Sequence, residues 1–411
     1  MRLACQFGFI LIAAAEMFAA DWQQYRGPNH DGSTPEKILK AWPREGPRQL
    51  WKVALGESFG SFAISGDKAF CFIQRAMGGK DQEVAIALDA NTGRELWATP
   101  IGKPTYESEG GNGPRSTPTV NGDRVYFLGA DLILSCLNAD NGTVIWQRDL
   151  VKEYNGTVIR WRSAASPVLD GGLLFVNGGG PGQAFLAFRK DGRLAWKTGN
   201  DLPTHSSTVA ATIHGERQII FFTQSGLVSL LPENGTELWR YPFPFEFSAA
   251  MSPIVYEDIV YCSAGYGVGA GACRITKTDA GFKATEIWRH PGETINQWTT
   301  PVCKDGYLYG IFGFKELGTA PLKCVEIATG KELWSQPGFG SGGGTILVDG
   351  HVLVQGDQGT LVLVEAVPKA YKEVARAQVL GGKCWTMPVI SNGRLYVRST
   401  KAGICLDVSV K

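Results

Sequence analysis

A motif that ends in tryptophan recurs along most of the chain and constrains its fold more than any other feature. Its clearest copy, at residues 87–97, reads Ala-Leu-Asp-Ala-Asn-Thr-Gly-Arg-Glu-Leu-Trp. Related copies, or in the first case only the final piece, end at seven tryptophans spaced 43–50 residues apart: Trp51, Trp97, Trp146, Trp196, Trp239, Trp288 and Trp334. A further copy has Ala375 where the tryptophan would stand. A period of this length predicts a repeat architecture.

A second repeated unit precedes each of these copies and reads Ser-Thr-Pro-Thr-Val-Asn-Gly-Asp-Arg-Val-Tyr at residues 116–126. Eight copies occur, the last at 386–396. Their Asn-Gly or Asp-Gly pairs favour hairpin turns that need a positive φ. A glycine four residues before most of the tryptophans, such as Gly93, fits a second hairpin in each repeat. Each repeat therefore has four short strands, and no segment after the first twenty residues has a helical period.

Four antiparallel strands in each unit of about 40–50 residues predict an all-β, eight-bladed β-propeller. The last unit, from residue 386 to about 408, has only three strands. We expect its fourth strand at 49–55, so that an N-terminal strand joins the C-terminal blade and closes the ring. We assign 48–411 to the propeller and expect the seven repeated tryptophans to be structural, docking between neighbouring blades.

The N-terminus has the pattern of an export signal. Arg2 precedes an apolar run that ends at Ala20, which predicts a signal peptide over residues 1–20. Residues 21–47 form an N-terminal extension whose packing the sequence leaves open. No later segment is long and apolar enough to cross a bilayer. With 40 Lys and Arg against 39 Asp and Glu, the net charge of +1 argues against nucleic acid as a partner.

The repeats resemble those of a known superfamily. The pattern Ala-x-Asp-x-x-Thr-Gly-x-x-x-Trp resembles the tryptophan-docking motif of the PQQ-like β-propellers, and the opening at residues 21–32 is similar to exported bacterial proteins with PQQ-binding-like repeats. This superfamily includes PQQ-dependent alcohol dehydrogenases and the non-enzymatic propeller lipoprotein of the outer-membrane assembly machinery. The resemblance covers nearly all of residues 21–411 and implies the fold, whereas one fold hosts many activities.

The resemblance also implies what a quinoprotein would need. PQQ enzymes of this superfamily carry an adjacent-cysteine disulfide, a set of carboxylates and asparagine that holds calcium, and a catalytic aspartate. The sequence has no Cys-Cys pair, and none of the catalytic positions can be matched. We therefore assign no catalytic residues, no metal ligands and no cofactor, and keep PQQ with calcium as the alternative.

The cysteines and glycines indicate no further chemistry. Cys136 and several other cysteines take the place that Ala87 has in the first complete repeat, as small buried side chains would. Cys262 and Cys273 lie on a predicted hairpin and either form a disulfide in an oxidising compartment or stay as free thiols. The sequence lacks closely spaced Cys or His pairs of the kind that bind metal, so it predicts no metal site. We expect the glycine-rich run at 265–271 to be a flexible loop, because no helix follows it to hold a phosphate.

The loops that join one blade to the next are the candidate binding region, because they should emerge on one face around the axis of the ring. Two of them are long, at 103–115 and 151–163. Aromatic rings and arginines there suit sugar, quinone or peptide recognition. The alternative is that Trp298 and Trp385 only plug the channel. The candidate ligand-binding residues are Arg115, Arg162, His205, Glu246, Trp298 and Trp385.

These observations predict an exported β-propeller, periplasmic or extracellular, that serves without catalysis as a binding or scaffolding module in the bacterial cell envelope. We expect a monomer whose partners are envelope proteins or peptides, or a small ligand at the axial mouth. The alternatives are a PQQ-dependent, quinoprotein-like oxidoreductase and a carbohydrate-binding propeller. A quinoprotein would need a deep axial pocket with at least two carboxylates placed for calcium.

Overall fold

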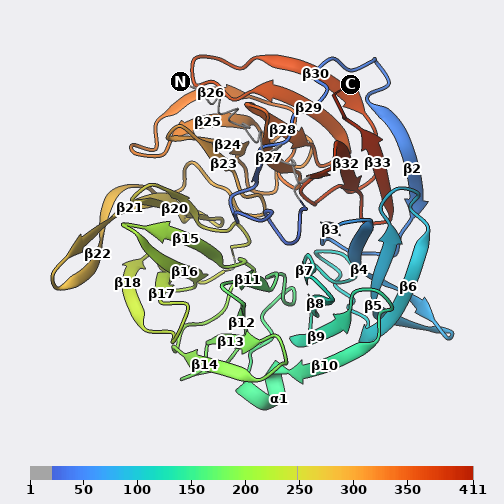
Figure 1. Ribbon diagram of the computed structural model, residues 1–411. Coiled ribbons are helices and arrows are strands. Elements are labelled where there is room, and N and C mark those ends of the chain that lie inside the picture. The colour runs from blue at the N-terminus through green and yellow to red at the C-terminus, as the bar shows by residue number, and fades with distance from the viewer. Residues whose placement is uncertain (1–20, 248, 411) are drawn as a thin grey trace, which may run out of the picture.

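The computed structural model describes residues 21–247 and 249–410, and these form an eight-bladed β-propeller (Figure 1). Eight sheets are arranged around a central axis, and each contributes four antiparallel strands, the first nearest the axis and the last at the outer rim. This arrangement confirms the predicted fold class. The predicted signal peptide at 1–20 lies outside the described residues.

The first four blades follow the chain in order. Blade 1 has β3 (Ala63–Ser65), β4 (Lys68–Met77), β5 (Lys80–Asp89) and β6 (Glu95–Gly102). Blade 2 has β7 (Thr119–Asn121), β8 (Arg124–Leu128), β9 (Ile133–Asn138) and β10 (Val144–Asp149). Blade 3 has β11 (Val168–Asp170), β12 (Leu173–Asn177), β13 (Phe185–Arg189) and β14 (Leu194–Thr198). Blade 4 has β15 (Val209–Ile213), β16 (Glu216–Thr223), β17 (Gly226–Leu230) and β18 (Glu237–Pro242).

The other four blades complete the ring. Blade 5 has β19 (Ile254–Tyr256), β20 (Ile259–Ala264), β21 (Gly269–Thr278) and β22 (Gly281–His290). Blade 6 has β23 (Val302–Lys304), β24 (Tyr307–Ile311), β25 (Leu322–Glu326) and β26 (Glu332–Gln336). Blade 7 has β27 (Gly344–Val348), β28 (His351–Gln355), β29 (Thr360–Glu365) and β30 (Glu373–Gln378). Blade 8 has β31 (Val389–Ser391), β32 (Arg394–Arg398), β33 (Ala402–Asp407) and β2 (Arg48–Ala54).

Blade 8 closes the ring as the sequence predicts. Its outermost strand, β2, comes from the N-terminal part of the chain and pairs antiparallel with β33, so that Trp51 lies opposite Cys405. The two ends of the propeller therefore share one sheet, and ring opening would require all the hydrogen bonds between these two strands to break together.

The repeated tryptophans lie between neighbouring blades. Six of the seven donate their Nε1–H to a backbone carbonyl in the next blade, over 2.7–3.1 Å. The glycine of the next blade's turn makes room for the ring: a Cβ on Gly142 would lie 2.5 Å from the Trp97 ring. This glycine also has a φ of +72°, so both its conformation and its missing side chain are needed.

Trp239 is the exception among the seven. It donates to Gln218 Oε1 in its own blade, over 2.7 Å. The following blade is the one in which β21 and β22 are each ten residues long, and their hairpin projects from the ring (Figure 1). The lengthened hairpin carries its turn away from the seam between blades 4 and 5, and Gln218 supplies the acceptor instead.

One short helix departs from the all-strand prediction. α1 (Leu150–Tyr154) follows β10 directly, and the side chain of its N-cap residue, Asp149, accepts a hydrogen bond from the Lys152 backbone N–H. Leu150 and Tyr154 are buried beneath it. A helix of five residues is too short to show a period of 3.6 in the sequence, and for that reason the predicted loop at 151–163 contains it unrecognised.

The N-terminal extension packs against the propeller and crosses one end of its channel (Figure 1, blue). The backbone carbonyls of Trp22 and Gln23 accept hydrogen bonds from the inner strands of blades 1 and 2. The Gln24 side chain bonds to the inner strand of blade 3. Farther along, β1 (Ser33–Thr34) pairs parallel with β27 of blade 7. The Glu36 carboxylate accepts backbone hydrogen bonds from blade 8. The segment is thus anchored on both sides of the ring.

The structure decides between the two alternatives for Cys262 and Cys273 and refines the expectation for the glycine-rich run. Cys262 and Cys273 are free, buried thiols, since Cys262 faces Gly271 across the β20–β21 ladder and Cys273 faces Val260. The glycine-rich run is a tight turn followed by the start of β21 rather than a flexible loop. Its first glycine, Gly265, lies close to other side chains: an added Cβ would lie 2.0 Å from the Gln297 amide oxygen and 2.9 Å from the Phe314 ring, so these side chains would have to move.

Candidate functional site

A cavity of about 820 Å³ lies on the propeller axis and opens where the loops between blades emerge. Its volume is within the ~300–1,000 Å³ typical of small-molecule sites. Tyr25 and Arg26 of the N-terminal segment line it from the closed end. Arg26 is buried and donates to the backbone carbonyls of Thr300 and Pro301 in the approach to blade 6. The extension therefore forms the floor of the cavity.

The wall above this floor is a belt of hydroxyls at one matching position in most blades. Each of these hydroxyl oxygens accepts a hydrogen bond from a backbone N–H of the preceding blade. The acceptors and donors are Thr117 and Ser61, Ser166 and Thr117, Ser207 and Ser166, and Thr300 and Ser252. The Ser61 hydroxyl donates to the Met387 carbonyl and links blade 1 back to blade 8. Because these polar groups satisfy one another, the belt holds the inner strands together at a fixed spacing.

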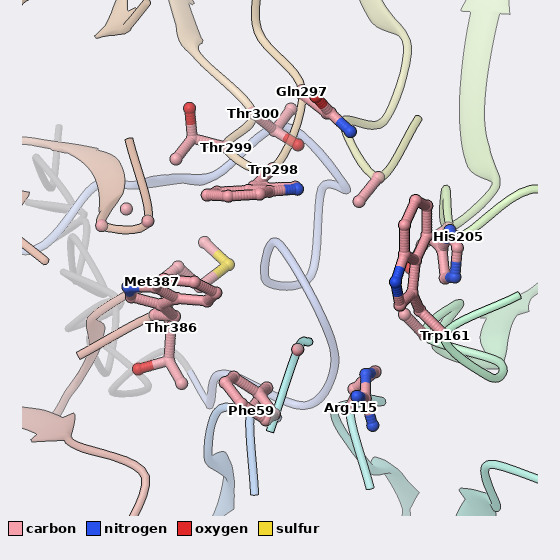
Figure 2. Close-up of a pocket in the computed structure, with 18 of the residues that line it drawn as sticks. Phe59, Arg115, Trp161, His205, Gln297, Trp298, Thr299, Thr300, Thr386 and Met387 are labelled. Carbon is pink, nitrogen blue, oxygen red and sulfur yellow. The ribbon is translucent and has the colours of Figure 1, made fainter. Parts of the chain in front are cut away.

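A second row of side chains lies two residues before the belt in each blade and surrounds the mouth. In chain order the row is Phe59, Arg115, Ala164, His205, Ala250, Trp298, Gly342 and Trp385, and every member lines the cavity. Four of the six predicted binding residues, Arg115, His205, Trp298 and Trp385, belong to this row, and Figure 2 shows three of them with Phe59 around one open space.

The other two predicted residues lie elsewhere. Arg162 is held in ion pairs with Glu107 and Asp131, at 3.2 and 2.8 Å, and is not part of the cavity lining. Glu246 is exposed and is not part of it either. Their chain neighbours Trp161 and Phe247 line the cavity instead. Trp161 has a φ of +63°, a backbone conformation that sequence patterns do not reveal for a tryptophan.

The aromatic side chains form two clusters on different sides of the mouth. Trp298 and Trp385 stack with ring centroids 4.9 Å apart, and Phe59 lies 5.9 Å from Trp385. On another side, Trp161 and Tyr266 are parallel within 11° with centroids 6.3 Å apart. The two tryptophans predicted either to bind or to plug therefore lie in the wall of an open cavity rather than closing it.

The charged groups of the mouth are mostly positive. Lys383 Nζ lies 4.2 Å from the Trp385 ring centroid, Arg115 Cζ lies 5.2 Å from that of Phe59, and Lys315 Nζ lies 5.1 Å from that of Tyr266. In the described part of the chain, none of these three cations has a carboxylate within 4.0 Å. Burial lowers the pKa of the Lys383 ammonium, and the nearby charge of Arg115 adds to that effect.

His205 is the buried base of the mouth. Burial lowers its pKa to about 4, and the positive charge of Arg115 contributes in the same direction. The imidazole is therefore neutral at neutral pH. Its ring lies 6.2 Å from that of Trp161, so it belongs to the second aromatic cluster (Figure 2).

The donor set of the cavity does not fit a calcium-bound quinone. Glu109 is the single carboxylate among the described lining residues, and it accepts hydrogen bonds from Trp161 Nε1 and Arg160 over 2.8 and 3.1 Å. Calcium takes six to eight oxygen ligands, several of them from carboxylates. Residues 21–247 and 249–410 contain no group of three His, Cys, Asp or Glu side chains placed to hold a metal. The deep pocket matches the quinoprotein alternative, whereas its side chains do not.

A family profile described as outer membrane protein assembly factor BamB matches residues 36–196, 80–311 and 318–407. The chain belongs to this family of PQQ-like β-propellers. A curated relative, the BamB of Yersinia pestis, is 21% identical over 256 residues, which are 58% of this chain and 61% of that protein. The match thus spans about three fifths of the relative's own length.

Solved structures show the same fold at low sequence identity. Quinohemoprotein alcohol dehydrogenase from Comamonas testosteroni is 12% identical with a TM-score of 0.65, over 95% of this chain and 81% of that one. BamB from Moraxella catarrhalis is 13% identical with a TM-score of 0.59, over 88% of this chain and 98% of that one. Family members thus share an architecture with enzymes and assembly factors alike. Among the described residues of this chain, no helix has the length and apolar character to span a bilayer.

Proposed function

We propose that this protein is an exported, non-catalytic binding module of the bacterial cell envelope that takes a ligand or a partner's side chains into its axial cavity. The observation that carries the proposal is the composition of the mouth. Two aromatic clusters and three cations without carboxylate partners surround one open cavity, and its one lining carboxylate is already hydrogen-bonded. Such a surface suits binding, whereas general acid–base catalysis needs a positioned group whose pKa lies near the working pH, and burial lowers the pKa of His205 to about 4.

Membership in the BamB family supports an envelope location, and the pattern at 1–20 supports export. Expression of the full chain in a Gram-negative host, followed by cell fractionation and intact-mass measurement, tests both. The expected product is a soluble or peripherally held monomer that begins at Asp21 and lies outside the cytoplasm. Retention of an uncleaved chain in the cytoplasm would contradict the export half of the proposal.

The non-catalytic half is tested by reconstitution. The purified chain is incubated with PQQ and calcium and offered a panel of primary alcohols, aldehydes and sugars, with reduction of an electron-accepting dye as the readout. No substrate-dependent reduction above the protein-free control is expected, because the cavity lacks the carboxylates for the metal. Turnover that requires PQQ and is abolished in a Trp298→Ala variant would overturn the proposal.

A further inference from the structure

Three cations at the axial mouth lie over aromatic rings and lack acidic partners. Elsewhere on the same face the arrangement is different: Arg162 is paired with two carboxylates, and Arg160 is paired with Glu109. Arg115 and Lys383 are partly buried, and a partly buried cation without a paired anion is costly unless a bound molecule supplies the negative charge. Lys315 is exposed at the rim of the cavity. The Arg115 guanidinium donates to the carbonyls of Gly111 and Gly113, which fix its position but leave its charge without a paired anion. Arg115, Lys383 and the exposed Lys315 are therefore positioned to attract an anion to the mouth.

The aromatic rings are arranged as platforms and not as a clamp. A planar guest held on both faces needs two parallel rings about 7–8 Å apart, which is twice the ~3.5–4 Å contact distance between carbon atoms. Trp298 and Trp385 stack with centroids only 4.9 Å apart, and Trp161 and Tyr266 are parallel with centroids 6.3 Å apart. Neither pair leaves a slot for a flat cofactor, so each pair is left with outward ring faces as contact surfaces.

The backbone at the mouth is not available to an extended peptide. Strand addition requires a row of unpaired N–H and C=O groups on a strand edge. Along the cavity wall, the N–H groups of Ser61, Thr117 and Ser166 already donate to hydroxyls of the next blade. Those of Ala250 and Met251 donate to the Gln297 carbonyl. Recognition in the cavity therefore depends on side-chain rings and positive charges.

We propose that the axial cavity binds an acidic oligosaccharide, a short chain of sugar rings that bear carboxylate or sulfate groups. A pyranose ring presents a puckered apolar C–H face, which packs on one side of an indole or phenol ring and needs no second ring opposite. Its acidic groups would accept charge-assisted hydrogen bonds from Lys383, Arg115 and Lys315. The cavity of about 820 Å³ has room for several sugar rings. This inference rests on the proposed binding role of the cavity.

The test is calorimetric titration of the full mature chain with matched probes. Tetragalacturonic acid supplies carboxylates, its methyl ester is the uncharged counterpart, and a sulfated tetrasaccharide supplies the other kind of acid. We expect one or both acidic probes to bind, with the ester weaker by roughly tenfold or more. Equal affinity for the ester, or no binding of either acidic probe, would overturn the inference.

Variants locate the binding and provide the control. Lys383→Gln and Lys315→Gln should each weaken the acidic probe by roughly tenfold, and Trp385→Ala should weaken both the acidic probe and the ester. Arg162→Gln removes a cation from the same face that already has carboxylate partners, so it should leave the affinity unchanged. Thermal melts of each variant show whether it is folded. A loss of affinity in Arg162→Gln equal to that in Lys383→Gln would show general charge attraction and contradict the proposed site.

Two further probes separate failure of this inference from failure of the proposed function. A glutamate-rich hexapeptide that binds more tightly than the sugars would replace the ligand class and leave the binding role intact. Tight binding of PQQ alone would do the same, whereas PQQ-dependent turnover of a substrate would remove the non-catalytic proposal as well.

Discussion

The seams between blades and the axial mouth are both built from one side chain per blade, and they differ in what varies from blade to blade. At the seams the position is almost always tryptophan, with Ala375 as the exception. At the mouth the matching position holds Phe, Arg, Ala, His, Ala, Trp, Gly and Trp in turn. A position that every blade fills alike serves what every blade needs, which is packing. A position that each blade fills differently is free to form a specific site.

This comparison predicts that tryptophans of the two regions differ in their contribution to stability. Trp97 is 9% exposed and lies between two blades, whereas Trp298 is half-buried at the mouth. Trp97→Ala should lower the free energy of unfolding by about 3–5 kcal/mol, the range for truncating a buried aromatic residue. Trp298→Ala should cost about 1 kcal/mol, mainly the loss of its stack with Trp385. Urea denaturation of both variants measures the difference, and equal losses would contradict the division into scaffold and site.

A buried acid beneath the mouth gives a pH-dependent test. Glu83 is 2% exposed and accepts hydrogen bonds from the Thr105 hydroxyl and the Ala130 N–H, so it connects the loop that carries Arg115 to blade 2. Burial raises its pKa from 4.5 to about 7. The folded state therefore binds the proton more tightly than the unfolded state. The stabilisation from protonated Glu83 is complete below pH 4.5 and is lost as the pH rises through 7.

Glu83→Gln isolates this contribution because glutamine does not titrate. The stability of the native chain minus that of the variant should fall by on the order of 3 kcal/mol between pH 4.5 and pH 8, since each unit of pKa shift corresponds to about 1.4 kcal/mol. Denaturation curves of both proteins across this pH range provide the measurement. A difference that stays constant with pH would show that Glu83 ionises as freely in the folded protein as in the unfolded one.

A glycine at a seam and a glycine in an inner hairpin turn give a smaller, matched test. Gly142 and Gly122 both have a positive φ, +72° and +59°. A Cβ on Gly142 would lie 2.5 Å from the Trp97 ring, whereas a Cβ on Gly122 would have nothing within 4 Å. Gly122→Ala should cost about 1 kcal/mol for the left-handed backbone alone, and Gly142→Ala should cost more by about 1–3 kcal/mol for the clash. Similar melting temperatures for the two variants would indicate that the ring moves aside freely.

The same distinction explains what the sequence could predict. Blade number, strand pairing and ring closure follow from features that occur in nearly every repeat, so each copy supports the others. The sequence predicts only part of the mouth, because Arg115, His205, Trp298 and Trp385 stand out as large or charged residues near inner strands. Phe59 could have been found too: it stands two residues before Ser61, as Arg115 stands before Thr117. Aligning the blades with one another, position by position, is therefore enough to locate the row without any relatives.

Other parts of the site had no signal in the repeats. The floor is made by Tyr25 and Arg26, which lie in a segment that occurs once and bonds to inner strands far away in sequence. Lys315 and Tyr266 reach the cavity from loops within blades 6 and 5, and both have a positive φ. Such long-range contacts and unusual backbone conformations depend on the assembled ring, so neither periodicity nor motif spacing indicates them.

The seam after blade 7 carries the smallest expected effect and tests the scaffold side most strictly. Ala375 stands in the tryptophan position of β30, opposite Leu363. At every other seam a blade with a continuous outer hairpin follows, and its turn provides the glycine and the carbonyl that most of the indoles use. Blade 8 has no such turn, because its outer strands β33 and β2 come from opposite ends of the chain. Ala375 is partly buried against the core, and an indole there would gain neither a glycine niche nor a carbonyl acceptor from a following turn. Packing gained and crowding should therefore nearly cancel, and Ala375→Trp should change the free energy of unfolding by less than about 0.5 kcal/mol. A gain of about 2 kcal/mol or more in denaturant titrations would show that indole burial alone, without the turn of the next blade, is what stabilises the seams.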